Sequence, residues 1–358
     1  MRSESPTLRT SRGLTVGVVG ATGMVGYELL SQLERRRFPV AVLKAFSSGA
    51  KRKTVRFRGR PVEAPGVSDA ALQACDLIFF VSSDEVSEAL APKLAARGVW
   101  CIDDSAAFRM DPDVPLVIPE VNAGALRRDR KLIAGPNCTM TGLAVAGYPI
   151  HRALGVRRAR VASYQAVSGA GKAALHEFFG QARALAPKMS NEEGPAPVFA
   201  AGVARALPAA IACNVIPQVG RFDARGNSSE ENKVADELRK IWGAPELKVS
   251  VTAVRVPVVR SHSLAAWLEC SKPLSPRRAR ALLKGAPGLT LSADGSYPTA
   301  LEAGGKDPVY AGRLRQGIDE HELCLWVVSD NLLKGAALNS IQIAEELLRR
   351  RWLAPGAN

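Results

Sequence analysis

The sequence lacks any run of about 18 apolar residues, and its start, MRSESPTLRTSRG, has no apolar segment of the kind found in signal peptides. We therefore expect no membrane-spanning or secretory segment. The six cysteines are scattered and form no Cys-x-x-Cys pair, which argues against a zinc site and against a disulfide framework. Such usage is typical of reduced thiols in the cytosol. We predict a cytoplasmic protein without a bound metal.

Motifs for nucleic-acid binding are also missing, although the formal net charge is +14. Much of the excess charge lies in arginine clusters at residues 35–37, 157–158 and 349–351. Neither zinc-finger spacing nor an aromatic RNA-binding strand accompanies them. A basic, solvated surface of this kind attracts small anions. The composition favours a small-molecule partner over nucleic acid.

The chain is long enough to bury a large core. It has 358 residues, of which 47% are hydrophobic and 23% charged, and both fractions are ordinary for globular proteins. A single hydrophobic core rarely organises so long a chain, and domains of about 150 residues are usual. The length predicts two domains.

The first 135 residues alternate short apolar runs with helical patterns. The run Leu14–Val19 ends at a glycine, and residues 27–36 then carry apolar side chains at helical spacing. Further buried strands are expected at 40–46, 77–81, 99–102 and 132–133, with a helix at 86–96. Strands that alternate with helices predict an α/β fold of the Rossmann type, with a doubly wound parallel sheet.

The pattern changes after Cys138, where strands and longer helical segments predict an α+β domain. The expected strands are at 161–167, 212–217, 249–256 and 265–269, with loops at 188–197 and 222–229. From Leu332 onward, one helix with a broad apolar face is expected to pack back onto the first domain. The predicted divisions are 1–137, 138–331 and a returning helix at 332–358.

A glycine-rich turn follows the first strand directly. Its sequence is Gly20-Ala21-Thr22-Gly23-Met24-Val25-Gly26, and it has the preceding strand and following helix that a dinucleotide site requires. The glycines permit a tight turn and let backbone N–H groups meet a pyrophosphate at the helix N-terminus. We predict that a nicotinamide dinucleotide binds there. The alternative is a turn with a structural role only.

The segment after the second strand bears on the choice of cofactor. NAD enzymes usually place a carboxylate there to bind the ribose 2′-OH. This chain instead has Ser47 and Ser48, followed by the cations of residues 51–53. Hydroxyls and cations suit a 2′-phosphate, so the sequence favours NADP over NAD. A basic turn that is merely solvated would have the same composition.

Cys138 is a candidate nucleophile. It lies in Gly135-Pro136-Asn137-Cys138, at the expected junction of the two domains, where a new helix begins. A position near a helix N-terminus lowers the pKa of a thiol and raises its thiolate fraction. The alternative is a buried structural cysteine.

Three later segments favour the catalytic interpretation. Gln165 ends a strand just before the small-residue turn at 168–171, which suits a planar ring. Arg255 and His262, seven residues apart around a strand, supply a cation and a titratable imidazole that can converge on a cleft. Asn331 lies before the last helix, where it either caps that helix or binds a carboxamide.

In its ordered set of motifs the chain resembles the aspartate-semialdehyde dehydrogenases. The motifs are GATGMVG, SAAFRMDPDVPLVIPEVN, PNC, YQAVSGAG, EENK, RVPV followed by HS, GKDPVY and SDNLLKGAALN. The resemblance implies a Rossmann-type domain plus an α+β catalytic and dimerisation domain, in a homodimer or a tetramer. It also implies NADP-dependent, phosphorylating interconversion of aspartate β-semialdehyde and β-aspartyl phosphate, in lysine, threonine and methionine biosynthesis.

The resemblance also implies a role for each candidate residue. Cys138 would attack the aldehyde, His262 would be the general acid/base, and Gln165 would orient the intermediate. The substrate-binding residues would be Arg255 for the α-carboxylate, Glu230 for the ammonium group, and Arg109 and Lys233 for phosphate. The cofactor-binding residues would be Gly20, Thr22, Gly23, Met24, Val25, Gly26, Ser47, Ser48, Ser168, Gly169 and Asn331.

The chain departs from the usual pattern of this family at four places. Those at Asp104, Ser261 and Leu264 keep a catalytically silent paralogue, with a binding or regulatory role, open as an alternative. Gly49-Ala50 stands where an Arg-Ser pair is frequent, and Asp104 stands where Asn is frequent. Ser261 replaces a Gly before the histidine, and Leu264 replaces a Glu after it.

Two other enzymes of thioester chemistry are disfavoured. An N-acetyl-γ-glutamyl-phosphate reductase has a substrate with an acylated amine, whereas a carboxylate at Glu230, with Gln165 after the cysteine, favours a free amino acid. A glyceraldehyde-3-phosphate-type enzyme is disfavoured by the residues that flank Cys138.

Overall fold

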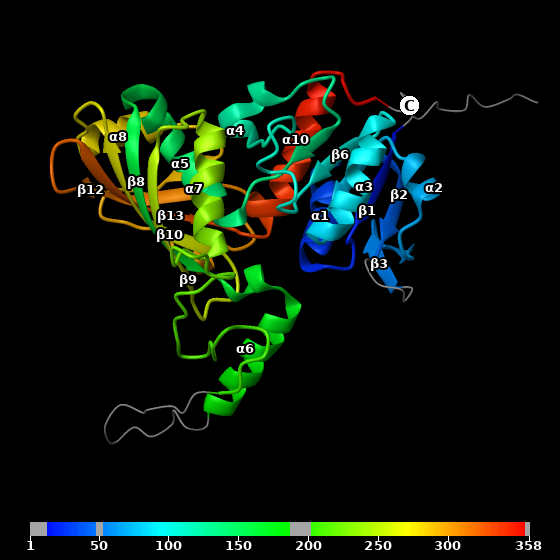
Figure 1. Cartoon of the computed structure of the whole chain (residues 1–358), viewed down its shortest axis with the longest axis horizontal. Coiled ribbons are helices and arrows are strands. Elements are labelled where there is room, and N and C mark those ends of the chain that lie inside the picture. Colours follow the sequence, from blue (N-terminus) through cyan, green and yellow to red (C-terminus); the bar gives the residue numbers. More distant parts are fainter. Residues whose placement is uncertain (1–12, 48–52, 187–201, 355–358) are drawn as a thin grey trace, which may run out of the picture.

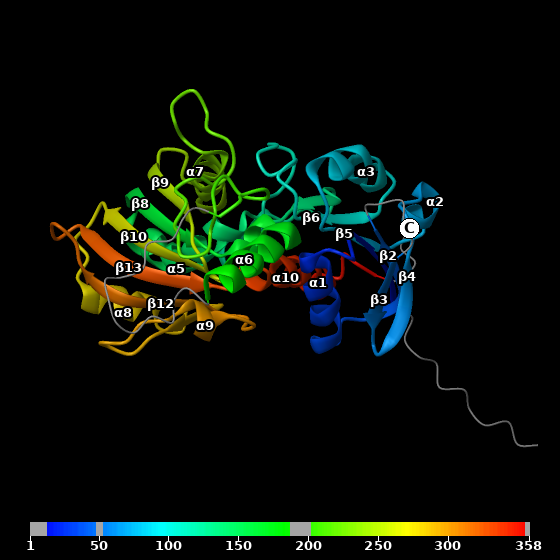
Figure 2. The same cartoon turned by 90° about the horizontal axis from the view of Figure 1, so that it is seen from below.

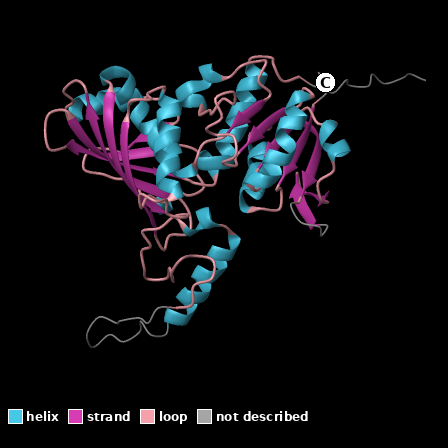
Figure 3. Ribbon diagram, in the orientation of Figure 1, coloured by secondary structure: helices cyan, strands magenta, loops and turns pink. Residues whose placement is uncertain are grey.

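The computed structural model describes residues 13–47, 53–186 and 202–354, which form two main β-sheets side by side (Figure 1). Helices pack against both sheets (Figure 3). Within these ranges, no helix has the length and apolar character needed to cross a membrane.

The first sheet is parallel throughout, as the alternation of strands and helices predicts, with the order β2-β1-β5-β6-β7. In β5, Leu77 and Phe79 face one hydrophobic cluster, whereas Ile78 and Phe80 face another. Burial on both faces explains why these strands are continuously apolar. The elements are β1 Leu14–Val19, α1 Met24–Arg35, β2 Val40–Phe46, β5 Leu77–Phe80, α3 Asp84–Ala96, β6 Trp100–Asp103 and β7 Leu132–Ala134.

The second sheet is mixed, with the order β11-β12-β13-β10-β8-β9. Its strands are β8 Val156–Gln165, β9 Lys248–Arg255, β10 His262–Cys270, β11 Leu289–Leu291, β12 Val309–Gln316 and β13 Glu322–Ser329. The helices that pack with it are α5 Cys138–Leu154, α7 Ser229–Trp242 and α8 Pro276–Leu283. A further helix, α6 Lys172–Leu185, projects from the molecule and lies over its middle when seen from below (Figure 2).

One predicted strand is wrong. Residues 212–217 form no strand, and only Ile216 pairs, through a single bridge to Arg255. Cys213 has a positive φ of 57° and Pro217 has no N–H to donate, so this segment cannot continue a ladder. The predicted loop at 188–197 lies outside the described residues. The segment 222–228 is a loop as predicted, and α7 follows it.

Several elements were not predicted. They are the hairpin β3 Lys53–Phe57 and β4 Arg60–Ala64, the short helices α2 Asp69–Gln73, α4 Pro119–Asn122 and α9 Ala300–Ala303, and the strands β11, β12 and β13.

The end of the chain returns to the first sheet. It is not one helix from Leu332, because a π-helical turn at Leu333–Ala337 precedes α10 Leu338–Arg349. The backbone N–H of Gly335 donates to the carbonyl of Asp330, five residues earlier, which widens the turn. Apolar side chains of α10 then join the hydrophobic cluster that contains β1 and α1.

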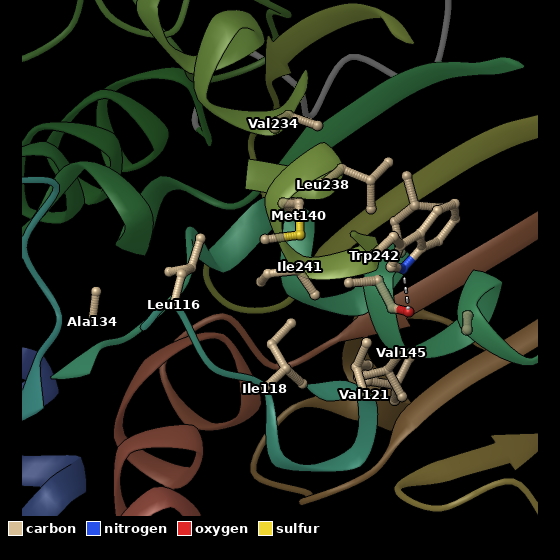
Figure 4. Close-up of a cluster of buried hydrophobic side chains, with 14 of the residues drawn as sticks. Leu116, Ile118, Val121, Ala134, Met140, Val145, Val234, Leu238, Ile241 and Trp242 are labelled. Carbon is tan, nitrogen blue, oxygen red and sulfur yellow. Dashed lines mark hydrogen bonds between the residues drawn. The ribbon is translucent and has the colours of Figure 1, made fainter. Parts of the chain in front are cut away.

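A hydrophobic cluster between the sheets fixes the direction of α5 (Figure 4). Met140 and Val145 of α5 pack with residues of α7, and the indole N–H of Trp242 donates to the carbonyl of Ala144 at 3.2 Å. A Cβ atom at Gly147 would lie 2.8 Å from the Trp242 ring, so only glycine lets the two helices approach this closely. Packing of α5 against α7 therefore fixes the position of Cys138, the first residue of α5.

A buried ion pair ties the π-helical turn to the short helix α4. Lys334 is 1% exposed, and its Nζ lies 2.5 Å from a carboxylate oxygen of Glu120 in α4. The same ammonium group donates to the side-chain oxygens of Asn339 and Gln342, at 3.0 and 2.7 Å. All three N–H bonds of the ammonium are thereby used, which offsets the cost of burying the charge.

Replacing Lys334 by Met should lower the free energy of unfolding by about 3–5 kcal/mol, because Glu120 would remain charged and without its partner. Urea denaturation followed by tryptophan fluorescence measures this change. The double variant Lys334→Met/Glu120→Gln should recover much of the loss. As a control, Arg130→Met breaks an exposed pair with Asp113 and should cost less than about 1 kcal/mol. A similarly small loss in Lys334→Met would contradict the prediction.

Candidate functional site

A pocket of about 390 Å³ opens between the glycine-rich turn, the start of α5, the turn after β8 and the π-helical turn. It brings together candidates from widely separated parts of the sequence. The predicted site residues that line it are Gly23, Met24, Val25, Arg109, Cys138, Ser168, Gly169 and Asn331.

The glycine-rich turn has a shape that larger residues would not permit. Gly20 has a φ of 90°, and a Cβ atom there would overlap the carbonyl group of Val81. A Cβ atom at Gly26 would overlap the carbonyl oxygen of Gly20, so α1 begins directly against the end of β1. The N–H groups of the first helical turn have no intrahelical acceptor, and Met24 and Val25 line the pocket. This cradle fits the phosphates of a dinucleotide.

The thiol of Cys138 lies at the N-terminus of α5. The side chain of Asn137 caps this helix by accepting hydrogen bonds from the N–H groups of Thr139 and Met140, at 2.8 and 3.1 Å. The Sγ atom lies 3.4 Å from Nε2 of His262. A Cβ atom at Gly335 would come within 2.8 Å of the Cβ of Cys138, so the π-helical turn packs directly against the thiol-bearing residue.

The protonation of the thiol differs from the sequence-based expectation. Burial, with a contribution from the carboxylate of Glu230, raises the pKa of the Cys138 thiol to about 11, although Arg109 and Arg255 act in the opposite direction. The helix N-terminus therefore does not leave this cysteine with a lowered pKa in the free protein. The low dielectric of the site disfavours the charged thiolate more strongly than the dipole of α5 and the nearby arginines favour it.

His262 is a neutral imidazole with a defined tautomer. Its burial, with a contribution from Arg255, lowers its pKa to about 3. The backbone N–H of Ala166 lies 3.0 Å from Nδ1 and can only donate, so Nδ1 accepts. The single proton of the neutral ring is then on Nε2, the nitrogen that faces Cys138.

Two carboxylates of α7 accept hydrogen bonds from the residues around Cys138 and position them. Glu230 accepts hydrogen bonds from the Thr139 hydroxyl at 2.7 Å, from the Gln165 amide at 3.1 Å and from the Asn137 amide at 3.0 Å. Glu237 accepts from the backbone N–H of Asn137 at 2.6 Å. These bonds join the ends of β8 and α7 to the first turn of α5, and they place Gln165 beside that turn.

Three predicted cations take different positions. Arg109 forms a buried ion pair with Glu237 at 3.0 Å, and its Nε is buried without a hydrogen-bond partner in the described chain. Arg255 donates to the carbonyl of Ala166 at 2.8 Å and forms no ion pair within 4 Å among the described residues, although the charge of Glu230 acts on it. Lys233 lies one turn after Glu230 on α7 and is not among the residues that line the pocket.

The predicted cofactor residues divide into two groups. Asn331 and Ser168 form a hydrogen-bonded pair at the pocket, and Asn331 also accepts from the backbone N–H of Ser261 at 2.9 Å. Ser47 is buried, with its Oγ 3.5 Å from the carbonyl of Pro65, and it does not line this pocket. Ser48 lies outside the described residues.

Lys172 joins the two sides of the pocket. Its ammonium group donates to the carbonyl of Thr22 at 2.9 Å and lies 4.9 Å from the centre of the Tyr27 ring. Thr22 thus contributes its carbonyl to a contact between α6 and the glycine-rich turn. Lys172 also lines the pocket, so this contact lies at its edge.

Sequence reasoning missed several residues that shape this site. Asn137 caps α5, a role that the sequence signals because an Asn just before a helix is a typical N-cap. Gly335 also carried a signal, because a glycine within an apolar helical pattern marks close packing. Nothing in the sequence singled out Glu237. In the described part of the chain, His, Cys, Asp and Glu side chains form no group of three that could hold a metal ion.

Two family models match the chain. Residues 15–128 match the model described as semialdehyde dehydrogenase, NAD binding domain. Residues 148–334 match semialdehyde dehydrogenase, dimerisation domain.

Individual proteins match over nearly the full length. An aspartate-semialdehyde dehydrogenase of Shewanella violacea is 44% identical over 95% of this chain and 99% of its own length. One of Bacillus subtilis is 41% identical, over 94% and 98%. The crystal structure of aspartate semialdehyde dehydrogenase II from Vibrio cholerae covers 94% of this chain and 99% of its own, with 38% identity and a TM-score of 0.87. In sequence and fold, this chain belongs to the aspartate-semialdehyde dehydrogenase family.

Proposed function

We propose that this protein interconverts aspartate β-semialdehyde and β-aspartyl phosphate, with NADP and phosphate, through a thioester on Cys138. The observation that carries the proposal is the pair formed by the Cys138 thiol and the Nε2 of His262, 3.4 Å apart. Cys138 of this pair lines a pocket that also contains the dinucleotide turn, and His262 is buried and is not among the lining residues. A solved structure of the Vibrio cholerae protein, 38% identical to this chain, is a complex with ASA.

The glycine-rich turn would hold the diphosphate of the cofactor, and the Ser168–Asn331 pair would hold its nicotinamide. Gly23, Met24 and Val25 offer the helix N-terminus to the diphosphate, and Asn331 offers an amide to the carboxamide. When bound, NADP⁺ accepts the hydride that leaves the substrate carbon. Ser47, with Ser48 and the cations that follow it, supports NADP over NAD because hydroxyls and cations suit a 2′-phosphate.

Cys138 and His262 would act together on the aldehyde. The sulfur bonds to the aldehyde carbon while the Nε2 proton of His262 goes to the aldehyde oxygen, and the freed nitrogen takes the thiol proton. After this exchange His262 again carries a proton on Nε2, so the proton of the new hydroxyl passes to water as hydride leaves and the thioester forms. Hydrogen phosphate attacks the thioester carbon, the carbon–sulfur bond breaks, and the proton of the phosphate group passes to the sulfur.

Charged side chains would select the substrate. Arg255 is buried without a carboxylate partner among the described residues, so its guanidinium can hold the substrate α-carboxylate. Glu230 has one oxygen with a single hydrogen bond, which leaves room for the substrate ammonium group. The unpartnered Nε of Arg109 suits a phosphate oxygen, and Lys233 would supply the second positive charge.

We also propose that the two domains have different functions. Residues 1–137, with the returning segment 332–358, would bind the cofactor, and residues 138–331 would supply catalysis and the contacts of a homodimer. We place the protein in the cytoplasm, in the biosynthesis of lysine, threonine and methionine. The scattered cysteines and the family to which the chain belongs support this assignment.

Replacing Cys138 by Ser should reduce activity at least about a thousand-fold, because the hydroxyl is a far weaker nucleophile than the thiolate. Formation of NADPH from aspartate β-semialdehyde, phosphate and NADP⁺, followed by absorbance, measures it. Cys213→Ser, at an exposed cysteine, should leave the rate unchanged. If wild-type protein shows no phosphate-dependent turnover with either NADP⁺ or NAD⁺, the proposed function is wrong.

Replacing Arg255 by Lys should lower kcat/KM for aspartate β-semialdehyde about 10- to 100-fold, because an ammonium group cannot reproduce two parallel hydrogen bonds to a carboxylate. Steady-state kinetics with the aldehyde as the varied substrate measures this effect. Arg130→Lys, at an exposed ion pair, is the matched control and should have no effect. An unchanged kcat/KM in Arg255→Lys would remove this residue from the substrate site.

Inactivation of the free protein by iodoacetamide should accelerate about tenfold per pH unit between pH 7 and 10. The raised pKa of Cys138, about 11, keeps the thiol protonated in this range, so the thiolate fraction grows with each unit. Loss of activity in a Cys213→Ala background, which removes the exposed thiol, reports on Cys138. A plateau that begins near pH 7 would show instead a thiol with a lowered pKa.

A further inference from the structure

Asp104 is a buried acidic side chain with one oxygen unused. It follows β6 directly and lines the pocket. Its Oδ1 accepts a hydrogen bond from the hydroxyl of Ser340 in α10, at 2.5 Å. Its Oδ2 is buried and has no hydrogen-bond partner in the described parts of the chain. An unsatisfied buried acceptor destabilises a folded protein, and more so when it is charged, so this oxygen needs either a proton or a ligand.

The charged neighbours of Asp104 do not neutralise it. Asp103 precedes it and is itself held by the hydroxyls of Ser87 and Ser105. Arg109 donates to the backbone carbonyl of Asp104 at 2.8 Å, but its ion pair is with Glu237. The other neighbours, Ser340 and the backbone at Gly135, are uncharged.

The balance of these groups favours a protonated carboxyl. Burial raises the pKa of Asp104 to about 7, and the negative charge of Asp103 raises it as well. The Ser340 hydroxyl and the charge of Arg109 act in the opposite direction without outweighing burial. Near neutral pH the free protein therefore contains both forms of Asp104.

We propose that Asp104 binds the phosphate group of a ligand in its protonated form, by donating Oδ2–H to a phosphate oxygen. This inference rests on the proposed function, which brings phosphate-bearing ligands to the pocket. The oxygen belongs either to the diphosphate of the dinucleotide or to inorganic phosphate. Ionised Asp104 would instead repel the same group, since it offers only lone pairs to an anion.

Binding of that ligand then takes up a proton from solution. Above about pH 7 the carboxyl must first be protonated, so the affinity falls by up to about tenfold per pH unit. Asp104→Asn keeps the shape and the bond to Ser340, carries no charge, and places two N–H donors where the protonated oxygen would be. Its affinity should not depend on this titration.

Titration calorimetry at pH 8, with NADP⁺ alone and with inorganic phosphate alone, tests the proposal. Repeating each titration in buffers of different ionisation enthalpy gives the number of protons taken up. Wild-type protein should take up close to one more proton than Asp104→Asn with the ligand that contacts Asp104, while protons exchanged by the ligand itself cancel in this difference. Asp84→Asn, at an exposed carboxylate that accepts from the N–H of Ala106, should match wild type.

Each outcome has a defined meaning. A difference with NADP⁺ only assigns the contact to the dinucleotide, and a difference with phosphate only assigns it to the inorganic ion. Equal proton uptake in wild type and Asp104→Asn with both ligands, at normal turnover, overturns this inference and leaves the proposed function standing. Failure of wild-type protein to bind either ligand overturns both.

Thermal unfolding supplies a second measurement that needs no ligand. Because the folded-state pKa of Asp104 lies above the ordinary value of 3.8, the folded protein holds an extra proton between pH 4 and pH 7. Stability from this group is therefore present at low pH and is lost as the pH rises through 7. The melting temperature of Asp104→Asn relative to wild type should rise from pH 5 to pH 8. A constant difference would contradict the titration of Asp104 in this range.

Discussion

The geometry of the site depends on two buried carboxylates that lie two helical turns apart on α7. Glu230 and Glu237 accept hydrogen bonds from Asn137, Thr139, Gln165 and Arg109, which come from three other segments of the chain. Each carboxylate is buried, so its charge is tolerated only while these donors are in place. The first turn of α5, and with it the thiol, can take only the position that satisfies both carboxylates.

The π-helical turn provides the second constraint on the thiol. Asp330 accepts from the N–H groups of Leu332 and Leu333 and thereby caps this turn, while Asn331 faces the pocket. The sequence left open whether this segment caps a helix or binds a ligand. Neighbouring residues divide the two tasks, because Asp330 makes the capping bonds and leaves the Asn331 amide beside Ser168. Gly335 then lets the turn rest against Cys138.

The sequence predicts those parts of the structure that depend on local order. The strand, glycine turn and helix at residues 14–35 are local, and so is the helix that starts at Cys138. Residues 212–217 look like a strand by composition, but Cys213 and Pro217 prevent the pairing that a strand needs. The pKa of Cys138 is not a local property, since it is set by burial under segments that are distant in the chain, such as those of Glu230, His262 and Gly335. The role of Glu237 could not be predicted from the sequence for the same reason, since it depends on contacts between distant segments.

The two protonation states at the centre of the site constrain how the nucleophile can be activated. At pH 7 a thiol with a pKa of about 11 is ionised in roughly one molecule in ten thousand, so a pre-formed thiolate is scarce. His262 cannot simply remove the thiol proton, because the backbone N–H of Ala166 occupies Nδ1 and the ring proton is already on Nε2. Nε2 becomes basic only after its proton has passed to another atom. In the proposed reaction the aldehyde oxygen is the group that gains basicity as sulfur bonds to carbon, so we expect activation of the thiol to depend on the presence of substrate.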